Sequence, residues 1–276
     1  MKRVLCLTDF SDCSLNAIQY AIALLKHEAC EFYILNVQSS RAFTMDDLMA
    51  APMSSSVYDS VIADNKKNVE QLIVKLQNDY CNEKVNFEGI VDYDVFIDSI
   101  NQVIASKSID LVVMGTNGAS NIREVIFGSN AVNVMRHIKC NTLMVPQLYN
   151  YKTIDDVLIL HLDDQEVDFK MLNSVFNVDT LTSTNKHLCK VYDTNKASNL
   201  IADMDEIEER YNAEGYNYRE IKDVPLDHFI NAYVQTNKAD LITVIANKQE
   251  MVSRTFIRYI KHIKEANQRP ILIAYN

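Results

Sequence analysis

The sequence predicts an α/β protein made of two tandem, doubly wound domains, each with a five-stranded parallel sheet. Short apolar runs alternate with segments of helical periodicity along the chain. The strand-like runs are continuously apolar, which indicates parallel strands covered by helices on both faces. The same order of segments then occurs a second time, so we expect a duplicated architecture.

The first copy opens with two buried strands separated by a helix. Lys2 to Leu7 is a short apolar run, and Phe32 to Val37 is a second one. Between them, the turn from Thr8 to Asp12 offers helix-capping side chains, and apolar residues at helical spacing follow it. Residues 38–56 contain Ser, Met, Asp and Pro52, so we expect a long irregular connection there.

The rest of the first copy supplies three more helices and three more strands. Each apolar run is again followed or preceded by a segment with helical periodicity. The expected helices lie in residues 62–80 and 96–104 and before Ile138, and the expected strands are Val85 to Val91, Leu111 to Met114 and Thr142 to Val145. Pro146 closes the last of these strands.

The pattern restarts after a boundary near residues 147–152. Six segments of the second copy repeat segments of the first in the same order, and Val157 to Leu160 (VLIL), for example, repeats Val4 to Leu7 (VLCL). Any two α/β segments share some pattern, but six matches in one order favour an internal duplication. We therefore expect one domain at residues 1–147 and a second at residues 153–276.

The composition describes a packed globular chain and disfavours several classes of function. Hydrophobic residues make up 48% of the 276 residues, and the net charge of −10 is shared by two acidic halves. Acidic surfaces disfavour DNA or RNA binding, and no apolar run approaches the roughly 20 residues of a membrane span. The N-terminus turns acidic too early for a signal peptide, and the 6 cysteines form no CxxC pair. We expect a cytoplasmic protein with no nucleic-acid or membrane partner.

Three of the 5 glycines in the chain lie within one stretch, Ile109 to Asn130. An apolar run ending at Met114 leads directly to Gly115, Gly118 lies in the loop that follows, and Gly128 precedes a helix-like segment. Glycine lets a backbone approach a ligand closely, and helix N-termini favour anions. A strand, a glycine loop and the start of a helix therefore predict a phosphate-binding loop.

Each of these signals also has a purely structural interpretation. The glycines could serve loop geometry alone, and Gly128 could relieve helix packing. Asp9, after the first strand, could be the N-cap of the first helix, and Ser129 could be only a cap of the later one. Capping and ligand contact are compatible, so both interpretations stay open at this point.

The second copy lacks the glycine loop. Direct alignment places Ile245 at the position of Gly115 and Lys248 at that of Gly118. Because the same scaffold is expected without these residues, we interpret the glycines as serving a ligand and not the fold. The helix that follows in the second copy carries a basic stripe, which we interpret as a solvated face: Arg254, Arg258, Lys261 and Lys264.

The first copy resembles the nucleotide-binding branch of the universal stress protein family, and the whole chain resembles a tandem member. Residues 115–129 fit the branch signature G-x2-G-x9-G-(S/T). Asp9 lies in a TDFS context typical of the branch, and Val37 closes the second strand in an LNV context like the family's LHV. The resemblance covers residues 1–147 by motif and residues 153–276 by topology. It implies an adenine-nucleotide alpha-hydrolase-like, Rossmann-like fold with the ligand at the carboxyl ends of the strands.

The resemblance also implies a role for each residue of the expected site. The Val37 backbone would meet the adenine edge, with Thr8 and Asp9 lining the adenosine pocket. Met114 and Gly115 would pass along the ribose, and the later residues would offer backbone N–H groups and a hydroxyl to the phosphates. The implied ligand is ATP, ADP or AMP, with a divalent ion such as Mg²⁺ bridging phosphate oxygens. The full set is Thr8, Asp9, Val37, Met114, Gly115, Gly118, Gly128, Ser129 and Asn130.

Nucleotide binding is favoured over turnover. The chain has no GxxxxGK[ST] P-loop, its glycine loop ends without a lysine, and Asp9 is the only obvious acidic group near the site. Efficient phosphoryl transfer needs a metal-holding carboxylate, a neutralising cation and a positioned nucleophile. We therefore expect an ATP-binding stress-response or signalling protein with slow or no hydrolysis. Two alternatives stay open: a non-catalytic assembly or interaction protein with a vestigial site, and a weak ATPase.

The resemblance further implies how the two copies meet. Family domains pair through their last strands, here Thr142–Val145 and Ile271–Tyr275. A tandem chain satisfies that pairing internally, as an intramolecular pseudo-dimer, and a further homodimer is compatible with it. The sequence leaves open which adenine nucleotide or cyclic dinucleotide is the physiological ligand, which stress is concerned and which downstream partner responds.

Overall fold

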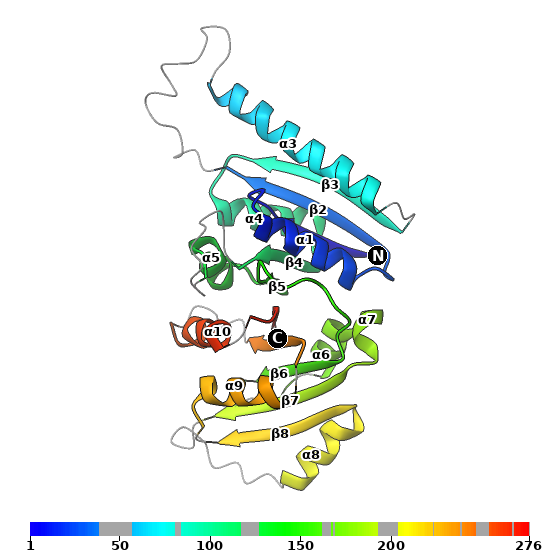
Figure 1. The fold of residues 1–276 in the computed structure, drawn as a ribbon, viewed down its shortest axis with the longest axis vertical. Coiled ribbons are helices and arrows are strands. Elements are labelled where there is room, and N and C mark those ends of the chain that lie inside the picture. Colours follow the sequence, from blue (N-terminus) through cyan, green and yellow to red (C-terminus); the bar gives the residue numbers. More distant parts are fainter. Residues whose placement is uncertain are drawn as a thin grey trace.

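A large, mostly parallel β-sheet runs through the molecule in the computed structural model of the chain (Figure 1). The structure describes residues 1–38, 57–80, 84–116, 127–161, 167, 169–192, 204–222, 224–237, 239–246, 254–266 and 268–275. Within these residues the sheet has 10 strands, and strands alternate with helices along the chain. The predicted α/β fold class is therefore confirmed.

The elements of the first half follow the predicted order closely. They are β1 (Lys2–Leu7), α1 (Asp12–Leu24), β2 (Cys30–Val37), α3 (Val57–Asp79), β3 (Val85–Asp92), α4 (Phe96–Lys107), β4 (Leu111–Gly115), α5 (Ser129–His137) and β5 (Thr142–Val145). Helix α3 begins before the first periodic residue that marks it in the sequence, Ile62. Most of the expected irregular connection, residues 39–56, lies outside the described residues.

The second half has the same strand pattern with shorter helices near its start. Its elements are β6 (Asp156–His161), α6 (Phe169–Phe176), α7 (Asp179–Thr182), β7 (Asn185–Tyr192), α8 (Met204–Ala213), β8 (Tyr216–Lys222), α9 (Leu226–Asn237), β9 (Leu241–Ala246), α10 (Arg254–Ala266) and β10 (Ile271–Tyr275). The expected segments of the second copy coincide with β6 to β10 and α9. Helices α6, α7 and α8 are not among the elements expected from the sequence.

The strand order is the same in each half. It reads β3-β2-β1-β4-β5 and then β10-β9-β6-β7-β8, and neighbouring strands within each half are parallel. In register, Val4 of β1 lies opposite Leu111, and Val157 of β6 lies opposite Leu241. The spatial pairing therefore gives the same alignment of the copies as the sequence does, with Gly115 at the position of Ile245.

The two halves meet through their last strands. Strand β5 pairs antiparallel with β10, and Leu143 lies opposite Leu272 at the middle of this short ladder. The expected pairing of Thr142–Val145 with Ile271–Tyr275 is thus present, and it makes the sheet continuous across the molecule (Figure 1). The division into domains at residues 147–152 stays a prediction.

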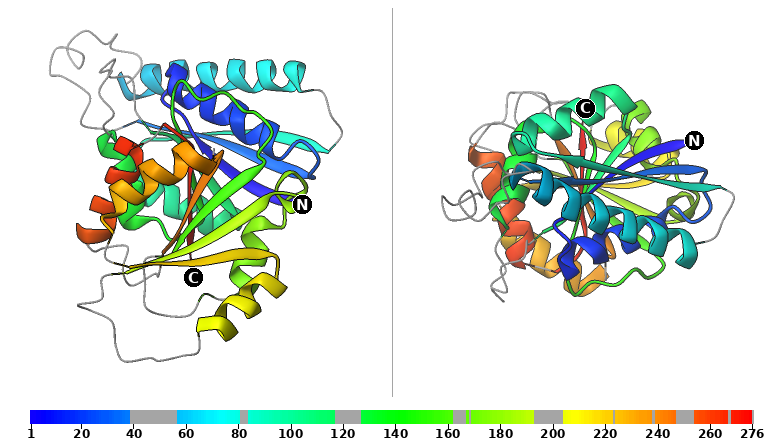
Figure 2. Two further views of the ribbon diagram at one scale, coloured as in Figure 1. Left: turned by 60° about the horizontal axis from the view of Figure 1, so that its bottom comes forward. Right: turned by 90° about the horizontal axis from the view of Figure 1, so that it is seen from above.

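Helices cover both faces of the sheet (Figure 2). On one face, Val4 and Cys6 of β1 pack in a core with residues of α1, α3, α6, α7 and α8. On the other, Leu5 and Leu7 pack with residues of α4, α5, α9 and α10. Alternate side chains of a buried strand point to opposite faces, so a continuously apolar strand supplies both cores.

Two equivalent aspartates anchor the first strand of each half to the fourth. The Asp110 carboxylate, just before β4, accepts the Arg3 backbone N–H at 2.8 Å. Asp240, just before β9, accepts the backbone N–H groups of Asp155 and Asp156 at 3.0 and 3.4 Å. Asp240 also forms an ion pair with Lys152, which lies in the segment between the two halves. This ion pair fixes that segment to the second half.

The described cysteines are free and buried, as expected for unpaired thiols in apolar positions: Cys6, Cys13, Cys30, Cys140 and Cys189. Burial raises the pKa of the Cys140 and Cys189 thiols to about 12. Thiols with raised pKa values are poor nucleophiles, so these cysteines have packing roles. Among the described helices, none has the length and apolarity that a membrane crossing requires.

Candidate functional site

The order of the strands gives the first half a switch point between β1 and β4. Strand β1 lies beside β4, yet the chain leaves β1 toward β2 on one side and leaves β4 toward β5 on the other. The connections after β1 and β4 therefore diverge. We call the space outside these two strand ends the opening, because doubly wound folds bind their ligands at this position. The residues that follow these two strands, Thr8 and Thr116, mark the floor of the candidate site.

The Thr8 side chain forms its hydrogen bonds within the turn that follows β1. It is buried, and its hydroxyl lies 3.0 Å from the Ser14 hydroxyl and accepts the Phe10 backbone N–H at 3.0 Å. The Thr8 carbonyl accepts from the buried Asn36 side chain at 2.8 Å, next to the end of β2. Thr8 therefore shapes the loop, while its side chain is turned inward.

Phe10 adopts a left-handed backbone conformation, with φ of 62°. This region is costly for a residue with a large side chain, and such conformations persist where the surrounding bonds enforce them. The Phe10 N–H bond to Thr8 and the start of α1 at Asp12 supply that constraint. The tight turn brings Asp9 to the exposed rim of the opening.

Asp9 is an ionised carboxylate at this rim. Its Oδ1 accepts the backbone N–H of Ser11 at 3.1 Å and the Ser11 hydroxyl. Partial burial alone would raise the pKa of Asp9, but the hydrogen bonds from Ser11 outweigh it and hold the pKa below its usual range. The N-cap of α1 is Ser11, whose side chain accepts from Ser14. The interpretation of Asp9 as the N-cap is therefore wrong.

Gly115 is required by the packing of α1 against β4. A Cβ at this position would lie 2.6 Å from the Cys13 Sγ and 3.0 Å from the Cys13 backbone carbonyl atoms. The first turn of α1 therefore rests directly on the end of β4. The interpretation that the fold does not demand the three glycines is wrong for Gly115. In the second half Ile245, buried at the equivalent position, packs in the core with residues of α6.

The α5 N-terminus lies against the end of β4. The Gly128 backbone N–H donates to the Thr116 carbonyl at 3.0 Å, which ties the helix start to the strand end. Gly128 is itself the N-cap, with φ of −59°, so its torsion angles suit any residue, and Ser129 is the first helical residue. Ser129 is therefore not the cap. The first N–H groups of a helix have no acceptor within it and carry the positive end of the dipole.

The remaining four residues of the expected set are in four different situations. Val37 ends β2 and is half-buried, and Gln38 after it is tied to the end of β3 by a bond from its N–H to Asp92. The Met114 side chain is buried in the core, so only its backbone faces the strand edge. Asn130 is exposed on the first turn of α5. Gly118 lies outside the described residues.

Lys264 is buried, although the sequence predicts that it lies on a solvated face. Lys264 of α10 is buried, with 4% of its surface exposed, and its ammonium lies 4.5 Å from the Phe127 ring centroid. The basic stripe was expected to be solvated; Arg258 and Lys261 are exposed, but Lys264 is not. The signal was present: Lys264 lies four residues after the buried Ile260, on the apolar face of α10.

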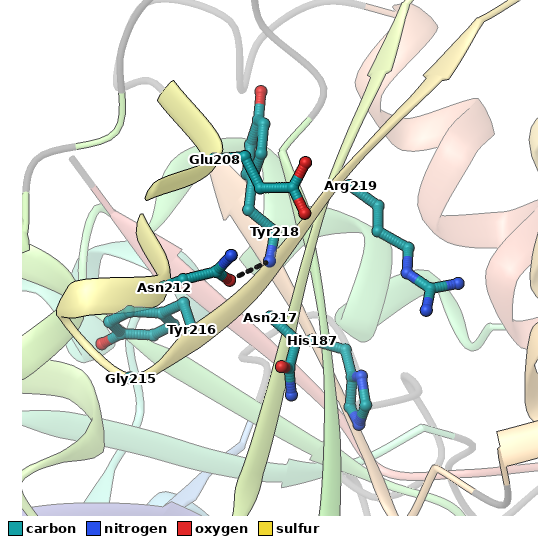
Figure 3. Close-up of a pocket in the computed structure, with 8 residues that line it drawn as sticks. All are labelled: His187, Glu208, Asn212, Gly215, Tyr216, Asn217, Tyr218 and Arg219. Carbon is teal, nitrogen blue, oxygen red and sulfur yellow. Dashed lines mark hydrogen bonds between the residues drawn. The ribbon is translucent and has the colours of Figure 1, made fainter. Parts of the chain in front are cut away.

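A pocket in the second half lies far from these strand ends. It measures about 460 Å³ and is lined by residues of α8, β7 and β8, including His187, Glu208 and Arg219 (Figure 3). Its β8 residues, Tyr216 to Arg219, begin that strand, so the pocket lies at the amino ends of the strands. In doubly wound folds ligands bind at the carboxyl ends. Figure 3 shows the Arg219 side chain directed away from the other lining groups.

The fold and the opening define a class of protein: a doubly wound α/β protein with an anion-favouring helix start at its strand-switch point. The sequence profile described as the universal stress protein family matches residues 1–146. The chain therefore belongs to the universal stress protein family, as the resemblance implied.

Two comparisons show how far the relationship extends. A Methanocaldococcus jannaschii protein, universal stress protein MJ0577, is 23% identical; the match covers 52% of this chain and 94% of that protein. The crystal structure of a universal stress protein from Archaeoglobus fulgidus covers 99% of this chain and 96% of its own, with a TM-score of 0.69 and 17% identity. The sequence similarity to the first protein covers about half of this chain, whereas the fold similarity to the second covers nearly all of it.

A second solved structure shares the fold within a different kind of protein. The cytoplasmic domain of a prokaryotic cation chloride cotransporter covers 99% of this chain and 95% of that domain, with a TM-score of 0.57 and 8% identity. This likeness shows a shared fold alone. A common architecture leaves function to be argued from the site.

Proposed function

We propose that this protein binds an adenine nucleotide, ATP in the first instance, at the carboxyl edge of its first half and acts in a stress response or in signalling. The observation that carries the proposal is the junction of β4, Thr116 and Gly128. It places the start of α5 at the carboxyl end of β4, the neighbour of β1, in a chain whose glycine signature matches this family. Helix N-termini at such positions are favourable sites for phosphate groups.

The described residues suit different parts of such a ligand. The end of β2 at Val37 would meet the adenine, and the turn at Thr8 and Asp9 would line the adenosine. The strand end at Met114 and Gly115 would follow the ribose. The Gly128 N–H is donated to Thr116, so Gly128 would line the phosphates without donating to them. Ser129 and Asn130 would offer the phosphates backbone N–H groups, and Ser129 its exposed hydroxyl, together with Gly118.

The donors fit a metal that arrives with the nucleotide rather than one held by the protein. Among the described residues there is no cluster of three or more acidic, histidine or cysteine side chains that could hold an ion. Mg²⁺ binds phosphate oxygens and keeps several waters, so it needs few protein ligands. The exposed, ionised Asp9 is the described side chain suited to orient a water of that ion.

Gly128→Asp tests the proposal sharply. Aspartate is a favoured N-cap residue and the torsion angles of Gly128 allow it, so the free variant should be as heat-stable as the parent or more so. Its carboxylate would repel phosphates, so ATP binding should fall by at least about tenfold. Isothermal titration calorimetry with ATP, ADP and AMP measures the affinity, and thermal melting measures stability.

The matched control places the same carboxylate far from the site. Asn217→Asp lies on the exposed surface of β8 and should bind ATP like the parent. Parent protein that binds none of the three nucleotides, and that releases no nucleotide absorbing at 260 nm on acid quenching, would overturn the proposal. Equal ATP affinity of the parent and Gly128→Asp would place the site elsewhere.

Two alternative functions make predictions that differ from those of nucleotide binding. An interaction protein whose second half serves assembly, and whose first-half site is vestigial, predicts no nucleotide affinity. A weak ATPase predicts linear release of ADP that Asp9→Ala abolishes. We favour holding over hydrolysis because the glycine signature does not end in the lysine of a P-loop.

The second half serves a different purpose in this proposal. The second half has no glycine at the positions of Gly115 and Gly118, so we place the nucleotide site in the first half. We infer that the second half completes an intramolecular pseudo-dimer by covering the β5 edge. A reducing cytoplasm is the compartment that the buried free thiols suit.

A further inference from the structure

We propose that a cavity between the two halves binds a small organic cation, namely an amine with an apolar body. The cavity measures about 480 Å³, within the usual range of small-molecule sites. Lys2, Asp110 and Asn141, at the starts of β1, β4 and β5, line it, so it lies at the amino edge of the first half. The proposed nucleotide site lies at the opposite edge, and this inference does not depend on it.

The β5–β10 junction forms the floor of this cavity. Leu143 of β5 and Leu272 of β10 lie opposite each other in the antiparallel ladder, and both line the cavity. The end of α1, from the first half, and the segment of α6 and α7, from the second, form its walls, near the N-terminus in Figure 1. The Thr180 hydroxyl donates to the Leu24 carbonyl at 2.6 Å, which ties these walls together. The cavity therefore exists only where the halves meet, and ligand sites are frequent at such boundaries.

The walls offer an apolar surface to the body of the ligand. Leu24 and Leu25 contribute from the first half, and Val175, Val178 and Leu181 contribute from the second. All five side chains are buried and belong to the core on this face of the sheet. An apolar body between these walls would be removed from water, which favours binding.

Carboxylates outnumber the cationic groups of the lining. Glu28, Asp110 and Asp179 line the cavity, and the positive charges of the lining are those of Lys2 and the amino group of Met1. An excess of negative charge at a partly enclosed site favours a cationic ligand over an anionic one.

Two of these carboxylates are held in place by backbone hydrogen bonds. Glu28 Oε1 accepts the Asp179 N–H at 2.9 Å, and Asp110 Oδ2 accepts the Arg3 N–H at 2.8 Å. Each bond uses one oxygen of its carboxylate. Within the described part of the chain, Oε2 of Glu28 and Oδ1 of Asp110 are therefore available to the N–H groups of an ammonium ligand.

Two helix C-termini add to the negative potential. Helix α1 ends at Leu24 and α6 ends at Phe176, and residues at both ends line the cavity. The C-terminus of a helix carries the negative end of its dipole and favours cations. Neither helix has a basic residue in its last turn. A cationic ligand would meet both helix ends.

Imperfect packing between the halves is the competing explanation. A cavity left by imperfect packing holds water or admits apolar molecules, and it does not select a ligand by its charge. The two explanations therefore differ in how affinity depends on the charge of the ligand.

Three probes with one apolar body test this difference: 4-phenylbutylammonium, 4-phenylbutanol and 4-phenylbutyrate. With the full chain and no nucleotide, we expect isothermal titration calorimetry to give the highest affinity for the ammonium probe and the lowest for the carboxylate. Equal affinities for the three probes, or no binding of the ammonium probe at millimolar concentration, would overturn the inference. Neither result would affect the proposed nucleotide site.

Charge-removing variants locate the site. Glu28→Gln combined with Asp110→Asn keeps an oxygen for each backbone N–H, and we expect its affinity for the ammonium probe to fall about fivefold or more. Asp179→Asn changes one exposed side chain and should lower that affinity about twofold. Glu209→Gln, on the exposed surface of α8, is the control and should match the parent. Thermal melting checks that each variant is folded. Parent-like affinity in the folded charge variants would overturn the inference.

Discussion

At the scale of single residues, the glycines of the first half divide by the contacts around them. Gly115 meets Cys13 so closely that no side chain fits, whereas Gly128 has torsion angles that any residue adopts. Gly115 therefore serves packing, and Gly128 is the glycine whose retention a ligand explains best. The sequence alone does not distinguish these two roles, because a local pattern does not reveal which distant segments approach each other closely.

Gly115→Ala should destabilise the protein by about 1–3 kcal/mol, the usual cost of overpacking a close contact. Cys13→Ala removes the Sγ nearest to the new methyl group, so the double variant should regain part of that loss. The coupling is measured by urea denaturation of the parent, both single variants and the double variant. Strictly additive effects would show that the Cys13 side chain is not the obstacle.

At the scale of elements, the elements with a strong local pattern in the sequence are the ones that agree best with the structure. Strands β1, β2, β4 and β5 were predicted closely because a buried parallel strand is apolar on both faces. The short helices α6 and α7 were not anticipated, because a few residues give little periodicity. The sequence does not predict the burial of Lys264, because the basic stripe and the apolar face overlap on α10. Whether a residue at this overlap is buried depends on the segment that packs against it, here Phe127.

The aspartates before β4 and β9 allow a matched test at this scale. Asp240→Ala removes an almost fully buried carboxylate that accepts from Asp155, Asp156 and Lys152. We expect a loss of about 2–3 kcal/mol at pH 7. Asp110→Ala removes an exposed carboxylate with one such backbone bond and should cost about 1 kcal/mol or less. Equal costs would show that burial does not govern the anchor.

The cost of Asp240→Ala should also depend on pH. Burial alone would raise the pKa of Asp240, but the bonds from Lys152 and from the Asp155 and Asp156 N–H groups outweigh it and lower the pKa. A carboxylate whose pKa is lower in the folded state stabilises above its unfolded pKa, about 3.9, and loses that contribution as the pH falls through the folded value. The stability difference between parent and variant, followed by urea denaturation, should therefore be largest near pH 7 and shrink below about pH 4.

At the scale of the whole molecule, the β5–β10 junction determines how the two halves act together. It joins two sheets of the same topology and reverses their strand directions, so the last turn of α10 reaches the carboxyl edge of the other half. Each face of the sheet carries a core with residues from both halves. The family match ends at residue 146, and the second half shares its fold with a solved universal stress protein.

A fragment of residues 1–147 should behave differently from the full chain. Without β10, the backbone groups of β5 form an exposed edge, and such edges pair with another copy. We expect the fragment to form a dimer in analytical ultracentrifugation. A fragment that stays monomeric at concentrations of tens of micromolar would contradict this prediction.

The sequence by itself determined the α/β class, the duplicated strand pattern, the family and the glycine stretch beside the candidate site. These features follow from periodicity and local motifs, which need no knowledge of distant contacts. Only the tertiary structure decided that Gly115 packs against Cys13, that Ser11 and not Asp9 caps α1, and that Lys264 is buried over Phe127. The contacts of Gly115 and Lys264 depend on which distant segments meet, and long-range packing sets that geometry. The cap of α1 depends on the backbone torsion angles of the turn, which the residue types alone do not determine.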